Sequence, residues 1–479
     1  MSNETVLAFC LALPVGGAAL IAACHRWPNV REAVSLVTAA ALFLAVLSLA
    51  QPVLDGTRPG LVLGEMFPGL AIKLELEPLG LLFALIASGL WLVSGVYSIG
   101  YMRGNDEPHQ TRFFVCFALA IAGAIGVALA GNLLTLYLFY EALTLVTYPL
   151  VTHHGDEEAR RGGRTYLGLL LLSSMLFLLP AMAITWWVGG TLDFTPGGIL
   201  GGRISGGAAA GLLALYAFGI GKAALMPIHR WLPAAMVAPT PVSALLHAVA
   251  VVKAGVFSIV KVVIYVFGLD FAADAFAWLP WVAGFTIVAA SIVALRADNL
   301  KRRLAYSTVS QLSYVVLAAA ILTPLSVIGA VLHIAAHAFG KITLFFAAGA
   351  VYTAAHKTQV SELDGIGRRM PWTFAAFGIG ALSMIGLPPA AGFVSKWYMV
   401  SGALAAEAWM PLAVIVASTL LNAGYFLPIV YRAFFLEGNA EAHGEAPWTM
   451  VAALVTTAAL TVAMFFWADL PLALARSLT

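Results

Sequence analysis

The sequence predicts an all-α polytopic membrane protein of about fourteen transmembrane helices. Of its 479 residues, 61% are hydrophobic and only 10% are charged, and its mean hydropathy is +0.94, far above that of a soluble domain. Apolar runs of about 20 residues, long enough to cross a bilayer, recur along the whole chain. Basic residues are concentrated in alternate loops. These three observations exclude a soluble globular protein.

Apolar windows between charged or Pro/Gly-rich breaks mark the predicted spans. They are 4–24, 33–50, 78–100, 113–130, 132–152, 164–188, 208–228, 241–268, 275–295, 303–322, 324–354, 372–406, 409–431 and 447–467. No basic segment precedes the first window, which runs up to His25 and Arg26. We therefore expect a retained helix there rather than a cleaved signal peptide.

Lysine and arginine residues are distributed unevenly between the loops. Loops on one side of the predicted membrane hold sixteen of the 25, and loops on the other side hold four. By the positive-inside rule, the basic loops face the cytoplasm and both termini lie on the outer side. Because these residues are dispersed and follow topology, we expect no nucleic-acid partner. Five lysines remain inside predicted spans: Lys222, Lys253, Lys261, Lys341 and Lys396.

These intramembrane lysines have one acidic counterpart. An ionised side chain in the middle of a lone helix costs about 2.5 to 3.5 kcal/mol, so such groups face protein, water or each other. Glu141, in "TLYLFYEALTLVTYPL", is the only one of 23 acids placed mid-span. Protonation of a buried Glu–Lys pair depends on the separation of its members, which suits proton transfer. Lys261 lies near a span end, and is either an interfacial anchor or a secondary functional candidate.

Histidines accompany two of the lysines. The stretch "HIAAHAFGKITLFF" places His333, His337 and Lys341 at positions i, i+4 and i+8, which stack along a helix over about 12 Å. A titratable stripe of this kind indicates a proton wire. Zinc binding is the alternative, but no neighbouring Cys, Asp or Glu completes a ligand set. His247 precedes Lys253 in another span and is either a second relay group or an interhelical hydrogen-bonding group.

Two lysines lie beside helix-breaking prolines. Lys222 is five residues before Pro227, and Lys396 follows the pair Pro388 and Pro389. Proline interrupts a helix, and the freed backbone groups are tolerated only where protein or water satisfies them. Discontinuous helices that carry an ionisable group in each half are typical of ion translocators built from inverted repeats. We therefore expect helices 7 and 12 to be discontinuous and helices 4–8 and 9–13 to form two inverted five-helix repeats.

The predicted organisation has four parts. Residues 1–112 form an N-terminal three-helix segment, 113–268 the first repeat, 269–435 the second repeat and 436–479 a final helix 14. The three cysteines show no paired spacing, and no P-loop, dinucleotide fingerprint or HExxH motif occurs. We expect no cofactor, no metal site and no catalytic chemistry in the chain, so that any redox chemistry belongs to a partner subunit.

Five motifs carry a family resemblance: "FYEALTLVTYPLV", "GKAALMPIHRWLPAAMVAPTPVSALLHAVAVVKAG", "KRRLAYSTVSQLSYV", "HIAAHAFGKITLFFAAGAV" and "GLPPAAGFVSKWYM". With them, the chain resembles the antiporter-like membrane subunits shared by complex I, membrane-bound hydrogenases and Mrp-type sodium/proton antiporters, over about positions 75–435. The resemblance implies fourteen core helices with two inverted repeats. It also implies proton transfer through a row of seven side chains: Glu141, Lys222, Lys253, His333, His337, Lys341 and Lys396.

Within this family, Lys396 and the stretch "NAGYFLPIVYRAFF" favour the D-type Mrp subunit, because the M-type subunit of complex I typically has glutamate at the position of Lys396. The resemblance implies membrane-subunit partners, the lipid bilayer, and protons with or without sodium, in a bacterial inner (plasma) membrane. The alternative is a proton-pumping subunit of a complex I-like NADH:quinone oxidoreductase or an energy-converting hydrogenase. A stand-alone organic-solute transporter or a membrane scaffold is a further, minor alternative.

Overall fold

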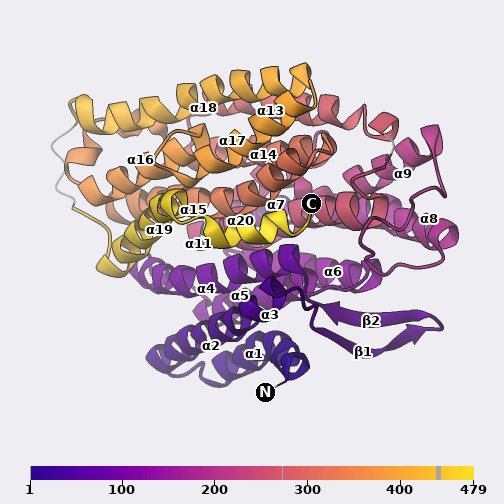
Figure 1. Cartoon of the computed structure of the whole chain (residues 1–479). Coiled ribbons are helices and arrows are strands. Elements are labelled where there is room, and N and C mark those ends of the chain that lie inside the picture. The colour runs from indigo at the N-terminus through magenta and orange to yellow at the C-terminus, as the bar shows by residue number, and fades with distance from the viewer. Residues whose placement is uncertain (1, 272, 439–443) are drawn as a thin grey trace.

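A computed structural model describes residues 2–271, 273–438 and 444–479 of the chain. Within these residues, eleven helical segments are long and apolar enough to cross a membrane. The described residues also contain a more polar helix, Leu300–Ala320, and two shorter apolar helices, Gly206–Gly219 and Pro371–Ile385. The all-α polytopic architecture predicted from the sequence is confirmed, with a small hairpin added to it (Figure 1).

The first half of the chain contains both strands. In order, its elements are α1 (Asn3–Ala23), α2 (Pro28–Ser48), α3 (Ala50–Leu54), β1 (Gly60–Phe67), β2 (Leu70–Glu75), α4 (Pro78–Gly104), α5 (Gln110–Ala128), α6 (Leu133–Val151), α7 (Glu157–Ser173), α8 (Leu179–Gly189), α9 (Gly206–Gly219) and α10 (Trp231–Ala234). A π-helical turn, η1 (Ser174–Leu178), joins α7 to α8 in one crossing.

Within its described residues, every regular element of the second half is a helix. Its α-helices are α11 (Thr240–Ala244), α12 (Val251–Val262), α13 (Leu279–Arg296), α14 (Leu300–Ala320), α15 (Pro324–Ala355), α16 (Pro371–Ile385), α17 (Ala391–Ala405), α18 (Trp409–Phe435), α19 (Trp448–Phe466) and α20 (Asp469–Arg476). A π-helical turn, η5 (Leu245–Val249), joins α11 to α12, and a second, η6 (Val263–Phe267), extends α12, so that residues 240–267 form a single crossing.

Two crossings lie at the centre of the bundle. The crossing 240–267 is fully buried over its most apolar window, and that of α15 is 94% buried. The windows of α1, α18 and α19, in contrast, are each only 33% buried. Ionisable groups on the two central crossings are therefore surrounded by protein, whereas the outer helices present apolar side chains to lipid.

The predicted seventh and twelfth spans are interrupted as expected. In span 208–228, α9 ends at Gly219 and the chain resumes as α10. In span 372–406, α16 ends at Ile385 and α17 begins at Ala391.

The hairpin of β1 and β2 connects the second and third crossings. The strands are antiparallel, with Gly60 opposite Glu75 and Phe67 opposite Leu70. The hairpin projects from one end of the helical bundle (Figure 1). Hydropathy windows of transmembrane length do not detect strands of eight and six residues.

Candidate functional site

All eight basic side chains that the sequence places within spans are buried. Their exposed fractions are 0% for Lys222, Lys253, Lys261, Lys341, His247 and His333, 1% for His337 and 5% for Lys396. All eight are therefore surrounded by protein and do not face lipid, as expected because an ionised side chain facing lipid is costly.

Lys222 lies in the break that ends α9, in the short turn η2 (Gly221–Ala223). Its ammonium donates to the Tyr140 carbonyl at 2.7 Å and to Thr144 Oγ1 at 2.5 Å, and lies 3.2 Å from the centroid of the Tyr140 ring. The backbone of the break is also satisfied: the Lys222 amide donates to Tyr140 Oη, and Trp231 Nε1 donates to the Gly221 carbonyl. Side chains thus replace the lost helical hydrogen bonds.

Glu141 follows Tyr140 on α6, but the structure does not bring its carboxylate into contact with Lys222. Neither carboxylate oxygen has a hydrogen-bond partner among the described residues, although both are shielded from solvent. The side chain is half-buried, and Leu145, one turn further along the same face, is 54% exposed. Glu141 therefore lies at the rim of the bundle, beside the Lys222 site.

Gly255 brings the Lys222 turn against the central crossing. A Cβ atom at Gly255 would lie 2.3 Å from the carbonyl carbon of Lys222 and 2.4 Å from the amide nitrogen of Ala223. Only glycine permits this approach of one backbone to another. The Lys222 turn therefore packs against α12 at a point two residues from Lys253.

Lys253 and the histidines of α15 form the centre of the site. Lys253 Nζ is hydrogen-bonded to His337 Nδ1, and the His337 and His333 ring centroids are 6.1 Å apart. His333 uses both ring nitrogens, Nδ1 with Ser395 Oγ at 2.9 Å and Nε2 with Gln311 Oε1 at 3.0 Å. The predicted stripe along α15 is thus connected to three neighbouring crossings.

The break between α16 and α17 supplies acceptors for Lys396. Its ammonium donates to the carbonyls of Met384 and Ile385 at 3.1 and 2.8 Å and to Thr419 Oγ1 at 3.3 Å. These carbonyls are available because α16 ends at Ile385. Gln311 Nε2 donates to the same Met384 carbonyl at 3.2 Å. One continuous chain of hydrogen bonds and ring contacts therefore connects Lys253 to Lys396.

A second branch begins at Lys341 and reaches the same carbonyl. Lys341 Nζ donates to Ser307 Oγ at 2.6 Å, and the Ser307 and Tyr425 hydroxyl oxygens are hydrogen-bonded at 3.2 Å. Tyr425 Oη also hydrogen-bonds to Asn422 Oδ1, and Asn422 Nδ2 donates to the Met384 carbonyl at 3.2 Å. Two branches from the central crossings thus converge at the helix break beside Lys396.

His247 makes no hydrogen bond within the described residues. Both of its ring nitrogens are buried and unpartnered, and its ring lies 4.7 Å from the Phe345 ring. The Ser243 hydroxyl, one turn earlier, is likewise buried and unpartnered. The interpretation of His247 as an interhelical hydrogen-bonding group is therefore not supported by these contacts, and buried polar atoms of this kind usually bind water.

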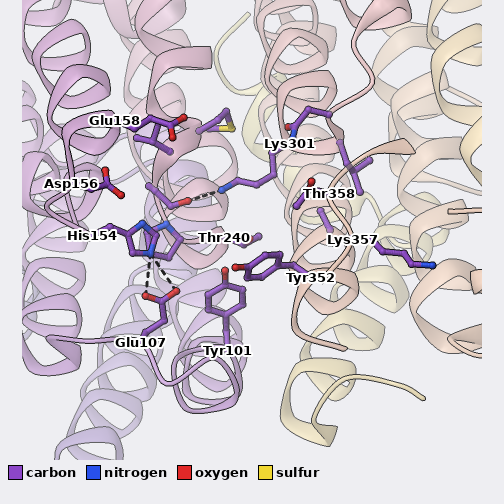
Figure 2. Close-up of a pocket in the computed structure, with 17 residues that line it drawn as sticks. Tyr101, Glu107, His154, Asp156, Glu158, Thr240, Lys301, Tyr352, Lys357 and Thr358 are labelled. Atoms are coloured by element: carbon purple, nitrogen blue, oxygen red, sulfur yellow. Dashed lines mark hydrogen bonds and ion pairs between the residues drawn. The ribbon is translucent and has the colours of Figure 1, made fainter. Parts of the chain in front are cut away.

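A cavity of about 390 Å³ opens at the end of the bundle where α11 begins (Figure 2). Its lining includes Thr240, the first residue of α11, together with Tyr352 and Lys301. His154 Nε2 lies 3.2 Å from Glu107 Oε2 in the same cavity. The hydrogen bond with this carboxylate raises the pKa of His154 above its usual value. The cavity thus combines basic and acidic groups.

Lys261 does not act as an interfacial anchor, because it is fully buried. Its ammonium lies 3.3 Å from Glu77 Oε1 and donates to the Ala130 carbonyl at 2.7 Å. Tyr265 Oη donates to Glu77 Oε2 at 3.1 Å. Glu77 precedes α4 and caps it through the amides of its first turn. Sequence reasoning treated this acid as a span-end residue and missed its pairing with Lys261.

Sequence reasoning also missed the neutral groups that connect the lysines: Tyr140, Thr144, Ser307, Gln311, Ser395, Thr419, Asn422 and Tyr425. Gln311 and Asn422 could have been found from the sequence, since an amide side chain inside an apolar span is costly unless it is hydrogen-bonded. The hydroxyl groups gave none, because Ser and Thr inside a helix commonly bond to their own backbone.

The fold and the buried row define a polytopic membrane protein with lysines and histidines buried at its centre and at interrupted helices. The profile of the family described as "NADH:quinone oxidoreductase/Mrp antiporter, TM" matches residues 130–427, and that of "NADH-Ubiquinone oxidoreductase (complex I), chain 5 N-terminus" matches 69–114. The chain belongs to the NADH:quinone oxidoreductase/Mrp antiporter family.

Three relatives illustrate the range of this family. NADH-quinone oxidoreductase subunit N of Desulforudis audaxviator is 34% identical over 85% of this chain and 81% of the relative. Subunit L of Mycobacterium tuberculosis is 33% identical over 78% of this chain, which spans 58% of it. A probable K(+)/H(+) antiporter component of Rhizobium meliloti is 31% identical over 77% of this chain and 37% of its own length.

A solved structure has the same fold. A chain of the Mrp complex from Dietzia sp. DQ12-45-1b superposes on this chain with a TM-score of 0.89 at 22% identity, over 100% of this chain and 97% of the other.

Proposed function

We propose that this chain is the proton-translocating subunit of a multi-subunit cation/proton antiporter. One observation carries the proposal: two branches of polar side-chain contacts, from Lys253 and from Lys341, converge on the Met384 carbonyl beside Lys396. A scaffold would not need this arrangement, because buried ionisable groups are costly and mark ion pathways.

The contacts support the following steps of proton transfer. A charged Lys253 donates a hydrogen bond to His337 Nδ1, and transfer of that proton leaves a neutral lysine and a histidinium. His337 then passes a proton to His333, whose nitrogens contact Gln311 and Ser395. The two ring centroids are 6.1 Å apart, and His337 Nε2 is buried without a partner among the described residues, so a water bound there would carry the proton between the rings.

Protons enter from the end of the bundle with the basic loops. Thr240, which lines the cavity in Figure 2, is followed on the same crossing by Ser243 and His247. The buried polar atoms of Ser243 and His247 have no protein partners, and water bound there would connect the cavity to Lys253. In this orientation, the cavity faces the cytoplasm of a bacterium, the membrane is the plasma membrane and both termini lie outside.

Glu141 and Lys222 form the end of the row nearest the surface. Since the Glu141 carboxylate is unpartnered and lies at the rim of the bundle, a neighbouring membrane subunit is the source of its counter-charge. Its charge state sets the protonation of Lys222 and so couples this chain to that neighbour. Two inverted repeats, 113–268 and 269–435, would place the broken crossings at Lys222 and Lys396 in equivalent positions.

A pump subunit in a redox-driven complex is the second candidate. It is favoured by the 34% identity to a subunit of NADH-quinone oxidoreductase. The row of lysines would move protons in the same way, with electron transfer in other subunits replacing the cation gradient as the coupled process.

The test uses inverted membrane vesicles that contain the assembled complex. Lys253→Met and Glu141→Gln should each abolish proton movement, while native gels show normal assembly. Transport at the unmodified rate in both variants would overturn the proposal. An imposed sodium or potassium gradient that drives proton movement identifies the antiporter, whereas proton movement only with NADH or another electron donor identifies the redox pump.

A further inference from the structure

Three side chains are spaced by one helical turn each along α12. Lys253, Phe257 and Lys261 occupy positions i, i+4 and i+8, so each neighbours the next on the helix surface. The rise from Lys253 to Lys261 is about 12 Å. The first lysine belongs to the central row and the second to the cluster with Glu77, and Phe257 separates them.

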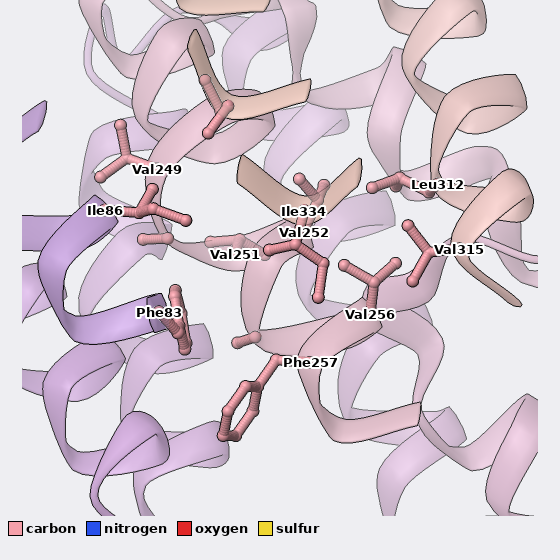
Figure 3. Close-up of a cluster of buried hydrophobic side chains, with 14 of the residues drawn as sticks. Phe83, Ile86, Val249, Val251, Val252, Val256, Phe257, Leu312, Val315 and Ile334 are labelled. Atoms are coloured by element: carbon pink, nitrogen blue, oxygen red, sulfur yellow. The ribbon is translucent and has the colours of Figure 1, made fainter. Parts of the chain in front are cut away.

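Phe257 belongs to a layer of buried apolar side chains. Figure 3 shows Phe83 and Ile86 of α4 on one side of α12, and Leu312 and Val315 of α14 on the other. The ring of Phe257 is fully buried and lies 5.2 Å from that of Phe83. Lys261 Nζ lies 5.2 Å from the centroid of the Phe257 ring, and therefore directly beyond the layer.

Beyond this layer, four groups contact the side-chain oxygens of Glu77. The amides of Leu79 and Gly80 donate to it at 2.7 and 2.9 Å, Tyr265 Oη at 3.1 Å, and Lys261 Nζ lies at 3.3 Å. Both charged side chains of the pair are at most 4% exposed. Glu77 therefore offers a proton acceptor that is buried from water and has partners for both of its oxygens.

Charged groups continue from this pair to the surface. Glu75, two residues before Glu77, pairs with Lys73 at 2.9 Å and with Arg58 at 3.8 Å, and Lys73 also pairs with Asp193 at 3.5 Å. Side-chain exposure rises from 4% at Glu77 through 18% at Glu75 to 51% at Asp193. The acids thus form a graded series from the buried pair to the surface at the hairpin end.

We propose that Phe257 is a hydrophobic gate between the central row and an outward release site at Glu77, which Lys261 positions. This inference rests on the proposed proton translocation. When the Phe257 ring moves and water enters the layer, the Lys253 ammonium releases a proton that crosses the water to the Glu77 carboxylate. Lys253 becomes neutral and Glu77 becomes a neutral acid. Release of that proton past Glu75 to the outer solution restores the carboxylate.

The test measures passive proton leak into proteoliposomes that contain the purified complex, under an imposed pH difference and without the driving cation or electron donor. Phe257→Ala should raise the leak on the order of tenfold, because the apolar barrier becomes wettable. Adding Glu77→Gln should return the leak to within about twofold of the unmodified complex, because the amide keeps an acceptor for the cap but takes up no proton.

Leu312→Ala is the matched control, since it opens a cavity in the same layer on the far side of α12. It should not raise the leak. A leak in Phe257→Ala that persists with Glu77→Gln, or an equal leak in Leu312→Ala, would overturn the gate.

Phe257→Leu, which keeps an apolar side chain, provides the same comparison if Phe257→Ala fails to assemble. An unchanged leak in the Phe257 variants that assemble also contradicts the proposal. If the gate proposal is wrong, Lys253→Met and Glu141→Gln should still abolish driven transport. Failure of the proposed function would instead appear as normal driven transport in those two variants.

Discussion

Lys253 and His337 are 84 residues apart in the sequence, and Nζ of the lysine is hydrogen-bonded to Nδ1 of the histidine at the centre of the bundle. Each residue lies on one of the two most deeply buried crossings. The bond links the crossing that contains α12 to the titratable stripe on α15, so it connects the lysine of one central crossing to the histidines of the other.

Replacing His337 tests whether this contact relays protons or only satisfies the lysine. His337→Phe removes the acceptor and leaves a buried ammonium short of one hydrogen bond, a loss worth about 1–3 kcal/mol. His337→Gln keeps an acceptor but cannot carry a proton. We expect both variants to lose at least about tenfold in proton transport in vesicles. Near-normal transport in His337→Gln would show that the histidine serves only as an acceptor.

The convergence at the Met384 carbonyl predicts non-additive losses. Gln311→Leu interrupts the branch from His333, and Asn422→Leu interrupts the branch from Lys341. Each single change should reduce proton transport only a few-fold, because the other branch remains. The double variant should lose more than the product of the single losses, by a coupling of about 0.5–3 kcal/mol in a double-mutant cycle. Strictly multiplicative losses would show that the branches act independently.

Gly255→Ala tests the close packing of the Lys222 turn against α12. The new Cβ would lie 2.3 Å from backbone atoms of Lys222, and overpacking of this kind costs about 1–3 kcal/mol. We expect a lower midpoint of thermal unfolding in detergent and reduced assembly.

The control for this substitution is Gly168→Ala on α7. Nothing lies within 4 Å of a Cβ at Gly168, and alanine there should be neutral or gain up to about 1 kcal/mol of helix stability. Equal destabilisation by both substitutions would show that the contact with Lys222 is not the cause.

The two histidines after α6 should affect stability in opposite directions with pH. Contact with Glu107 raises the pKa of His154, so its charged form stabilises the fold below about pH 6.5 and this contribution is lost as the pH rises through the raised pKa. Burial lowers the pKa of His153 to about 4. Its neutral form therefore contributes stability above about pH 6.5 that is lost as the pH falls toward 4.

Thermal unfolding of the assembled complex between pH 5 and 8 measures both contributions. His154→Gln should make the midpoint less sensitive to pH on the alkaline side, and His153→Gln should make it less sensitive on the acidic side. The opposite assignment of the two variants would contradict these pKa shifts.

Much of this arrangement follows from the sequence alone. The length of each apolar run predicts where the chain crosses the membrane, because a bilayer of fixed thickness requires about 20 residues per helix. The prolines near Lys222 and Lys396 predict the two interrupted helices, because proline removes a backbone hydrogen-bond donor. The spacing of His333, His337 and Lys341 gives the stripe along α15, because helical periodicity is a local property.

Contacts between crossings depended on the tertiary structure. The Met384 carbonyl accepts from Gln311, Asn422 and Lys396 only because α14, α18 and α17 pack against the end of α16. Lys261 found Glu77 across 184 residues, where the sequence left an interfacial anchor equally open. Hydropathy and local periodicity predict which ionisable groups lie inside the membrane and how deep they lie. Side-chain packing between distant helices decides which of these groups share hydrogen bonds, and the periodicity of a single helix does not encode that packing.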